Sequence, residues 1–200
     1  MISGLTCGEF PCNDVRHDHF ITPEVDLNPE HVSVVMISEA APQDRGDYYY
    51  ADGDPLFQRT TVSAFNDAGV SVSSIADILK FGVYLTTAVK CAKIGYGIKA
   101  DTISECSYLL ERELEAFPNL KVLMLMGDVA IKAVNYIAKR AGEKRVLPAG
   151  STYKIRGEEY YFKGIRALPS YLQAGPSFFI EKSKRRMITE DIASAVELVR

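Results

Sequence analysis

Two pairs of cysteines, Cys7 with Cys12 and Cys91 with Cys106, carry the most distinctive chemistry in this sequence. Four residues separate the first pair and fourteen separate the second, and the 200-residue chain has 4 cysteines in all. Four thiolates gathered from two distant segments are a ligand set for a [4Fe–4S] cluster or a structural zinc ion. Two disulfides and four unrelated thiols are the alternatives. Residues 1–20 lack the basic and apolar regions of a signal peptide, so we expect a cytoplasmic protein with reduced thiols, which argues against disulfides.

Two of the histidines allow a second metal hypothesis. A compact Cys₂His₂ zinc site would be formed by Cys7, Cys12, His17 and His19. The other two cysteines would then be ordinary buried thiols. We favour the four-cysteine set, because Cys91 directly follows an expected strand and Cys106 lies on the inward face of an expected helix.

The composition is that of a globular protein, with 47% hydrophobic and 24% charged residues. The net charge of −3 gives no global field that would attract nucleic acid, so any such contact must come from a local basic patch. No apolar run approaches the roughly 18 residues that would cross a bilayer, and we expect no membrane contact. The length indicates one domain, or one domain with an appendage, and we expect a monomer.

The elements that must position these residues alternate regularly after an irregular start. Residues 1–30 are predicted to be an arm that packs on a domain formed by residues 31–200. The hydrophobic pattern predicts strands at 32–37, 83–89, 122–126 and 160–167, and helices at 61–68, 74–80, 101–117, 129–141 and 183–198. Alternating strands and helices predict a three-layer α/β/α fold around a four-stranded, mainly parallel sheet. Ligands of such sheets bind beyond the carboxyl ends of the strands.

The segments at these strand ends, taken in order, resemble the motifs of the uracil-DNA glycosylase superfamily. Residues 36–42, Met-Ile-Ser-Glu-Ala-Ala-Pro, are similar to a strand that ends in Gly-Glu-Ala-Pro-Gly. The other similar segments are 54–57 for a Pro-Phe segment, 85–91 for Asn-x-x-Lys-Cys, 123–130 for Leu-Gly-x-x-Ala and 168–170 for His-Pro-Ser. The order and the cysteines are closest to the iron–sulfur branches, families four and five. The resemblance implies the superfamily's α/β/α fold, DNA glycosylase activity, and a [4Fe–4S] cluster held by Cys7, Cys12, Cys91 and Cys106.

The sequence also departs from these motifs. Ser38 stands where the first motif has Gly, and an extra residue precedes Pro42. Thr87 occupies the position of the Asn that reads the uracil edge, and Leu168 replaces the His that stabilises charge on the base. The first cysteine pair has a spacing of four residues instead of two. Two groups of the uracil pocket are therefore altered.

The reaction suggests roles for residues near the strand ends. Cleavage of an N-glycosidic bond passes through a sugar cation, which a carboxylate stabilises while it orients water. Glu39 and Asp44 are the candidates. Alternatively, the Glu39 carboxylate is only bonded to a nearby backbone amide, and Asp44 is a solvated turn residue. Phe57 would stack on the base, or simply pack in the core. Thr87 has one hydroxyl that would shape the base pocket, although a β-branched strand residue needs no such role. Ser170 is a further possible donor to the base.

A second group of residues is predicted to contact DNA. Gly127 opens a helix whose free amides would hold a phosphate, or it serves only a tight turn. The loop at 168–179 includes Tyr171 and is apolar, as a wedge into the base stack would be. The basic residues that follow, Lys182, Lys184, Arg185 and Arg186, would hold phosphates, unless they form a solvated helix face.

These features predict a hydrolase that removes a deaminated or damaged base, uracil or a related one, from DNA in base excision repair. Its partner would be DNA that contains such a base. One alternative is a non-catalytic member of the superfamily that binds DNA or damage, which the altered Thr87 and Leu168 favour. The other is a hydrolase of nucleosides or small metabolites on the same fold.

Overall fold

The computed structural model describes residues 5–200, so residues 1–4 of the expected arm lie outside the described part. A six-stranded sheet runs in the order β1-β3-β2-β4-β6-β5. The four inner strands pair in parallel and the two edge strands are antiparallel to their neighbours. The bounds are β1 Val15–Arg16, β2 Val34–Ala41, β3 Val83–Lys93, β4 Val122–Met126, β5 Tyr160–Phe162 and β6 Ile165–Ser170.

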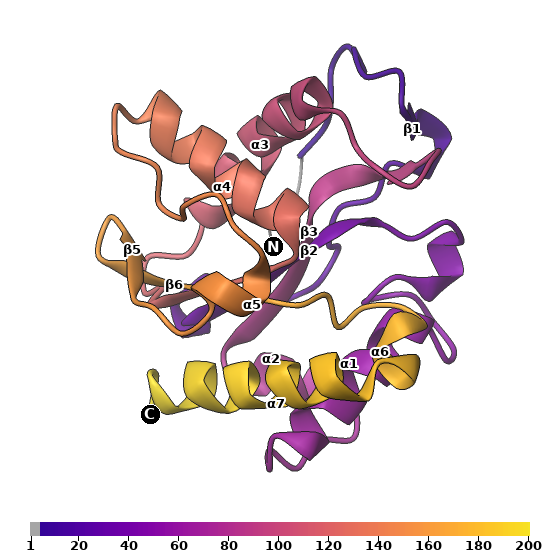
Figure 1. Cartoon of the computed structure of the whole chain (residues 1–200). Coiled ribbons are helices and arrows are strands. Elements are labelled where there is room, and N and C mark those ends of the chain that lie inside the picture. Colours follow the sequence, from indigo (N-terminus) through magenta and orange to yellow (C-terminus); the bar gives the residue numbers. More distant parts are fainter. Residues whose placement is uncertain (1–4) are drawn as a thin grey trace.

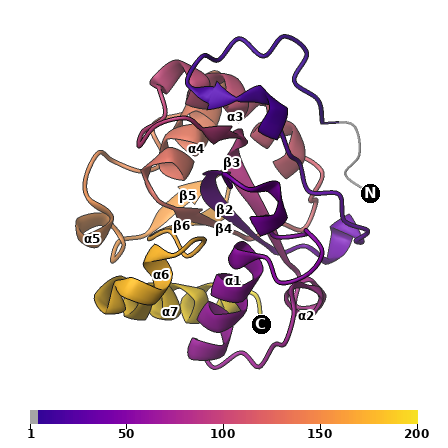
Figure 2. The same ribbon diagram turned by 90° about the vertical axis from the view of Figure 1, so that its right-hand side faces the viewer.

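Helices cover both faces of the sheet (Figure 1). One face carries α3 (Ala100–Leu114) and α4 (Asp128–Arg140), and the other carries α1 (Leu56–Asp67), α2 (Ile75–Lys80) and α7 (Lys182–Glu197), as the view in Figure 2 also shows. The remaining helices are short: α5 Thr152–Ile155, α6 Ser177–Ile180, and the 3₁₀ turns η1 His17–His19, η2 Pro29–His31 and η3 Arg45–Asp47. The predicted three-layer fold is confirmed. None of the helices in residues 5–200 is long and apolar enough to cross a membrane.

The alternation of side chains explains why the inner strands are almost entirely apolar. In β2, Val35 and Ile37 join the core beneath α3 and α4, whereas Val34 and Met36 join the core beneath α1 and α7. A strand that is buried on both faces needs apolar residues at every position. The sheet therefore separates two hydrophobic cores, and the polar residues inside β3, Thr86, Thr87 and Lys90, are buried.

The predicted number of four strands is wrong, because two short edge strands were not anticipated. β1 is two residues long and has no hydrophobic period of its own. Residues 160–167, predicted as one strand, form a hairpin of β5 and β6 instead. Its turn is made by Lys163 and Gly164, whose φ angles are 49° and 81°. Successive residues with positive φ are typical of a tight hairpin turn.

The N-terminal arm is fastened along the end of β3. Val15 and Arg16 pair with Lys93 and Ala92. The Ile21 amide donates to the Lys90 carbonyl oxygen over 2.8 Å. The carboxylate of Asp14 accepts a hydrogen bond of 2.6 Å from the Lys99 amide and another from the Thr102 hydroxyl. The arm is therefore held by the polypeptide itself at the end of β3 where the candidate ligand Cys91 lies.

A buried ion pair joins β3 to α3. Lys90 Nζ lies 2.5 Å from Glu113 Oε2, and neither side chain is exposed to solvent. Glu113 Oε1 accepts hydrogen bonds from the hydroxyls of Tyr84, over 2.7 Å, and Thr86, over 2.9 Å. Lys90 Nζ also donates to the Thr87 carbonyl oxygen over 2.8 Å. Because both charges are surrounded by hydrogen-bond partners, the pair is tolerated in the core.

Removing only the acidic partner should destabilise the protein strongly. In Glu113→Leu, the Lys90 ammonium would remain buried without a counter-ion, and we expect the free energy of unfolding to fall by about 3–5 kcal/mol. Urea denaturation measures this loss. The double variant Lys90→Met/Glu113→Leu buries no charge and should recover most of it.

An exposed ion pair supplies the matched control. Asp128 and Lys132 on α4 lie 2.5 Å apart, with 71% and 46% of their side chains exposed. Asp128→Asn should therefore cost at most about 1 kcal/mol. Equal losses in Glu113→Leu and Asp128→Asn would contradict the structural importance of the buried pair.

Candidate active site

A pocket of about 270 Å³ opens at the carboxyl ends of β2 and β3. Its walls come from the end of β2 and the loop after it, from the start of α1, from the last residue of β3, and from the loop after β6. The lining residues that bear on its chemistry are Ser38, Glu39, Asp47, Phe57, Lys93 and Leu172. This is the sheet edge at which open parallel sheets bind their ligands.

Glu39 and Lys93 form an ion pair in this pocket. Glu39 Oε2 lies 3.2 Å from Lys93 Nζ, and 24% and 30% of the two side chains are exposed. Lys93 Nζ also donates to the carbonyl oxygen of Tyr96 over 3.2 Å. We predicted Glu39 from its position after a buried strand, but not Lys93, because the motif around it ends at Cys91.

Asp44 and Asp47, two of the aspartates in the loop after β2, have different places. The carboxylate of Asp44 accepts the Gly46 amide over 2.9 Å, is exposed, and is not among the described residues that line the pocket. Asp47 does line it, and its Oδ1 accepts the first amide of α1, that of Leu56, over 3.0 Å. We did not predict Asp47, since it lies nine residues before Leu56 in the sequence, and the fold of the loop brings the two together.

Phe57 supplies an aromatic wall. It lies in the first turn of α1, lines the pocket, and packs on Tyr49 with ring centroids 5.2 Å apart. Burial raises the pKa of Tyr49 to about 12, so its hydroxyl stays neutral at physiological pH. The predicted stacking residue is therefore in the pocket, with a rigid neighbour behind it.

A buried polar group lies beside this aromatic wall. Gln173 Nε2 donates to the hydroxyls of Tyr49, over 3.2 Å, and Thr61, over 3.1 Å, while its Oε1 has no hydrogen-bond partner. Its chain neighbours Leu172 and Ala174 line the pocket. Thr87 pairs with Ser38 in the sheet, is fully buried, and its hydroxyl is also unpartnered. Thr87 is not among the described lining residues, and Gln173 was not predicted from the sequence.

Ser170 is directed at α7. Its hydroxyl donates to Asp191 Oδ2 over 2.6 Å, and Asp191 in turn pairs with Arg156 over 2.6 Å. Burial raises the pKa of Asp191, although hydrogen bonds from Arg156 and Ser170 oppose the shift. Leu168 is buried in the core beneath α1 and α7. Neither Ser170 nor Leu168 is among the described residues that line the pocket.

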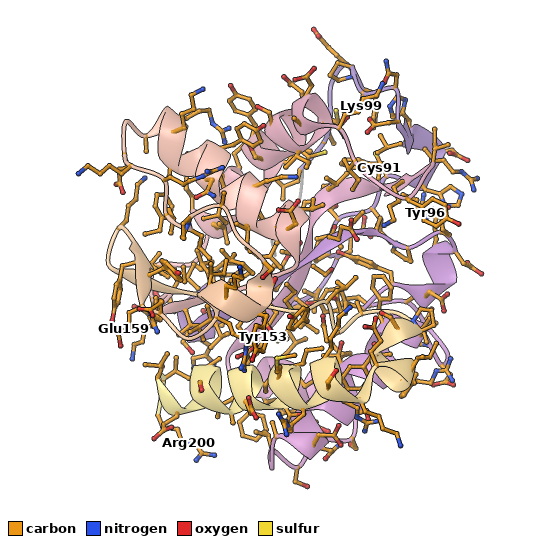
Figure 3. The ribbon with its side chains drawn as sticks, in the orientation of Figure 1. Cys91, Tyr96, Lys99, Tyr153, Glu159 and Arg200 are labelled. Atoms are coloured by element: carbon orange, nitrogen blue, oxygen red, sulfur yellow. The ribbon has the colours of Figure 1, made fainter. Side chains whose placement is uncertain are left out.

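The four cysteines approach one another on the other side of the β3 end. Burial raises the pKa of Cys91 to about 12, and the thiols of Cys106, Cys7 and Cys12 lie close enough to add to the shift. All four are free thiols. A cavity of about 260 Å³ is lined by Cys7, Cys12 and Cys106. Figure 3 shows Cys91 at the same end of the molecule as Tyr96 and Lys99.

Four thiols are the kind of donor set that an iron–sulfur cluster takes. Among residues 5–200, no three or more His, Cys, Asp or Glu side chains are grouped to hold a metal ion, and this includes the alternative set with His17 and His19. In a [4Fe–4S] cluster, each iron takes its own thiolate. The ligands of a cluster therefore surround a volume instead of converging on one point; three of the four cysteines line the cavity, and Cys91 does not.

The predicted DNA-contact residues are mostly engaged within the protein. The Gly127 amide, at a φ of 98°, donates to the Ser170 carbonyl oxygen over 2.9 Å. Lys184 pairs with Glu181 over 2.6 Å and lies 5.6 Å from the centre of the Tyr171 ring. The other ion pairs join Arg185 to Asp67 over 2.5 Å and Arg186 to Glu190 over 3.6 Å. Lys182 is exposed and takes part in none of the ion pairs found among the described residues.

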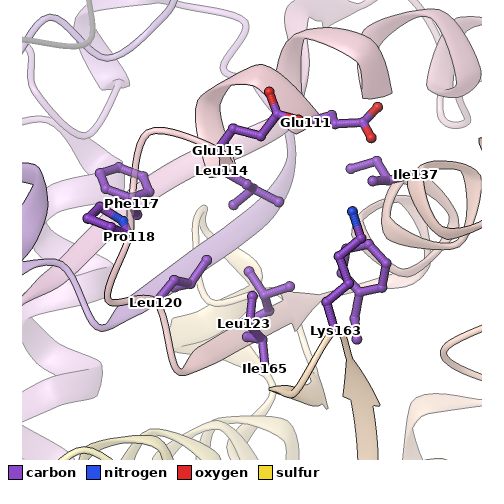
Figure 4. A pocket seen from close by; sticks show the side chains of 11 residues that line it. Glu111, Leu114, Glu115, Phe117, Pro118, Leu120, Leu123, Ile137, Lys163 and Ile165 are labelled. Carbon is purple, nitrogen blue, oxygen red and sulfur yellow. The ribbon is translucent and has the colours of Figure 1, made fainter. Parts of the chain in front are cut away.

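A second cavity, of about 280 Å³, lies between α3, the start of β4 and the β5–β6 turn (Figure 4). It is lined mainly by apolar side chains such as Leu114, Leu123 and Ile165, with Lys163 extending along it. Glu111 at its edge is paired with Arg140 over 2.7 Å. This cavity is at the amino ends of the parallel strands, so the pocket with Glu39 is the better candidate active site.

Comparison with known protein families identifies one family that matches this chain. The model of the uracil DNA glycosylase superfamily matches residues 25–190, which include every residue that lines the Glu39 pocket but neither Cys7 nor Cys12. Among solved structures, the wild-type UNG crystal structure from Nitratifractor salsuginis is similar. It has 13% sequence identity and a TM-score of 0.41, and the match covers 82% of this chain and 74% of that chain. A search of curated proteins found no match.

The bidentate contact of Arg185 is expected to stabilise the fold. Arg185 Nε and Nη2 reach both oxygens of Asp67, over 2.5 and 2.9 Å, and tie α7 to α1. Because the pair is about one-third exposed, we expect Arg185→Ala to lose about 1 kcal/mol, a fall of about 2–4 °C in melting temperature for a chain of this size. Thermal denaturation measures it. Lys182→Ala is the control and should stay within about 0.5 kcal/mol of wild type; an equal fall in both variants would refute the distinction.

Proposed function

Since the chain belongs to the uracil DNA glycosylase superfamily, we propose that it is a DNA glycosylase that hydrolyses the N-glycosidic bond of a deaminated or damaged base. The observation that carries the proposal is the Glu39 carboxylate in the wall of a pocket that Phe57 also lines. A volume of about 270 Å³ is just below the range of about 300–1,000 Å³ for drug-sized ligands, which suits a single flipped nucleoside.

The pocket residues divide the reaction between them. Water adds to the anomeric carbon of the sugar, the bond to the base breaks, and the base leaves with the electron pair. Glu39 accepts the proton of this water and stabilises the sugar cation by its charge. Phe57, backed by Tyr49, offers a flat apolar face on which the extruded base stacks.

Exposed apolar side chains beside the pocket favour DNA over a free nucleoside as the substrate. Ile94 and Tyr96 follow Lys93 and are 64% and 101% exposed, and Figure 3 shows Tyr96 at the edge of the molecule. Phe179 and Ile180 follow the lining residue Pro176 and are 47% and 76% exposed. Apolar tips around a base pocket suit insertion into a base stack or stacking on unpaired bases. A small metabolite would not reach them.

We also propose that Cys7, Cys12, Cys91 and Cys106 hold a [4Fe–4S] cluster, as in the iron–sulfur branches of the superfamily. The cavity lined by Cys7, Cys12 and Cys106, and the place of Cys91 in the same core as Cys106, support this. Cluster iron would compensate the charge of thiolates that burial disfavours. Hydrolysis of a glycosidic bond needs no electron transfer, so the cluster would serve to pin the arm to β3 and α3.

Removal of the carboxylate tests the proposed activity. We expect Glu39→Gln to slow base release by roughly 10²–10³-fold from whichever oligonucleotide the wild type cleaves, among those with uracil, hypoxanthine or xanthine. Gel analysis after alkaline strand scission measures the release. Asp44→Asn makes the same change of charge outside the pocket and should leave the rate near that of wild type.

Three outcomes would redirect the proposal. Tight DNA binding without release of any base would support the non-catalytic alternative. Hydrolysis of free nucleosides without activity on DNA would support the metabolite alternative. Equal rates for Glu39→Gln and wild type would remove Glu39 from the reaction.

The cluster has its own test, which does not depend on activity. Anaerobically purified protein should be brown, absorb broadly near 400 nm, and contain about four irons and four sulfides per chain. Cys106→Ser should lose this absorption and have a lower melting temperature than wild type. His19→Asn should keep the absorption and the melting temperature of wild type. One zinc per chain that is lost in His19→Asn and kept in Cys106→Ser would instead support the Cys₂His₂ site.

A further inference from the structure

Lys93 is the only cationic side chain among the described residues that line the Glu39 pocket. Its Nζ is held between two oxygen acceptors, Glu39 Oε2 and the Tyr96 carbonyl, each at 3.2 Å. With 30% of the side chain exposed, it is half-buried and open to the pocket. Two acceptors in fixed positions fix where the charge of Lys93 lies.

The proposed reaction needs a cation or donor for the base, and the other candidates are placed elsewhere. The base leaves with the bonding electron pair and carries negative charge. Leu168 is apolar, and the hydroxyl of Ser170 is bonded to Asp191. Ser38 lines the pocket, but its hydroxyl donates to the Thr86 carbonyl oxygen over 3.3 Å. His31 precedes β2, at the opposite end of that strand from Glu39.

We propose that Lys93 is a catalytic residue that stabilises the negative charge of the departing base, an inference that rests on the proposed glycosylase function. As the bond between base and sugar breaks, the Lys93 ammonium donates a hydrogen bond to an oxygen of the base. Glu39 meanwhile faces the sugar cation. The ion pair is thus a fixed dipole whose two ends match the charge separation of the transition state.

The same geometry argues against covalent catalysis by Lys93. An imine with the abasic sugar requires an uncharged amine that attacks the aldehyde and then loses water. Lys93 Nζ is bonded to a carboxylate and to a carbonyl oxygen, and both contacts would have to break before Nζ could attack the sugar. The structure therefore favours an electrostatic role for Lys93 over a lyase reaction.

Leaving-group dependence tests this role. Single-turnover rates are measured for two pairs of oligonucleotides, with uracil and 5-fluorouracil, and with hypoxanthine and xanthine. In each pair the second base is the more acidic and leaves more easily as an anion. We expect Lys93→Met to slow release of the poorer leaving group by roughly 10²–10³-fold. The factor by which it slows release of the better leaving group should be smaller by about ten-fold or more. Lys93→Arg keeps the charge and should recover part of the rate.

A matched variant controls for the loss of a paired lysine. Lys80 pairs with Asp77 on α2, over 3.2 Å, and is not among the residues lining the pocket. Lys80→Met should therefore leave all rates unchanged. Melting temperatures and DNA affinities of each variant are measured alongside, so that misfolding or weaker binding is recognised as such.

The outcomes separate this inference from the proposed function. If wild-type protein releases no base, both fail. If it does and Lys93→Met slows both members of a pair equally, Lys93 only positions Glu39 and this inference alone is overturned. Borohydride trapping of a DNA adduct with wild type but not with Lys93→Met would overturn it in favour of an imine.

Discussion

The parallel pairing of β2 with β3 is the interaction on which the rest of the structure depends. The strands run in register from Val34 opposite Val83 to Ala40 opposite Val89, and then Ala41 pairs with Ala92. This shift leaves two residues of β3, Lys90 and Cys91, without a recorded partner on β2, and brings the end of β3 beside Glu39. This one irregularity therefore affects both faces of the sheet. It places Cys91 on the face covered by α3 and Lys93 at the pocket.

The buried ion pair makes this strand end rigid. Lys90 and Glu113 join β3, which carries Cys91, to α3, which carries Cys106. Burying two charges is expensive, and apolar side chains of similar volume would often be as stable. They would not, however, fix the rotation of α3 against β3 through directional contacts. A fixed rotation is what keeps Cys106 near Cys91, whatever the four thiols hold.

The sequence predicts the features that follow from local pattern. The run of apolar residues at 122–126 is a strand with the predicted bounds, because it is buried on both faces and ends at a glycine. Glu39 was predicted for the pocket because it follows such a run. The hairpin within 160–167 was missed because Lys163, with its positive φ, is not a typical turn residue. Lys93 was missed because the shifted register that brings it to Glu39 is a tertiary feature.

The distribution of charge shows what kind of DNA would suit the proposed pocket. The chain has a net charge of −3, and the cations of α7 are largely consumed by internal contacts such as that of Arg185 with Asp67. We expect α7 to attract phosphates only weakly, and apolar contact with bases through Tyr96 and Ile180 to contribute to the affinity of the proposed function. Base faces are available in single strands and at mispaired sites but are hidden in a stacked duplex. The surface around the pocket therefore favours a base that is already poorly stacked, for which extrusion costs least.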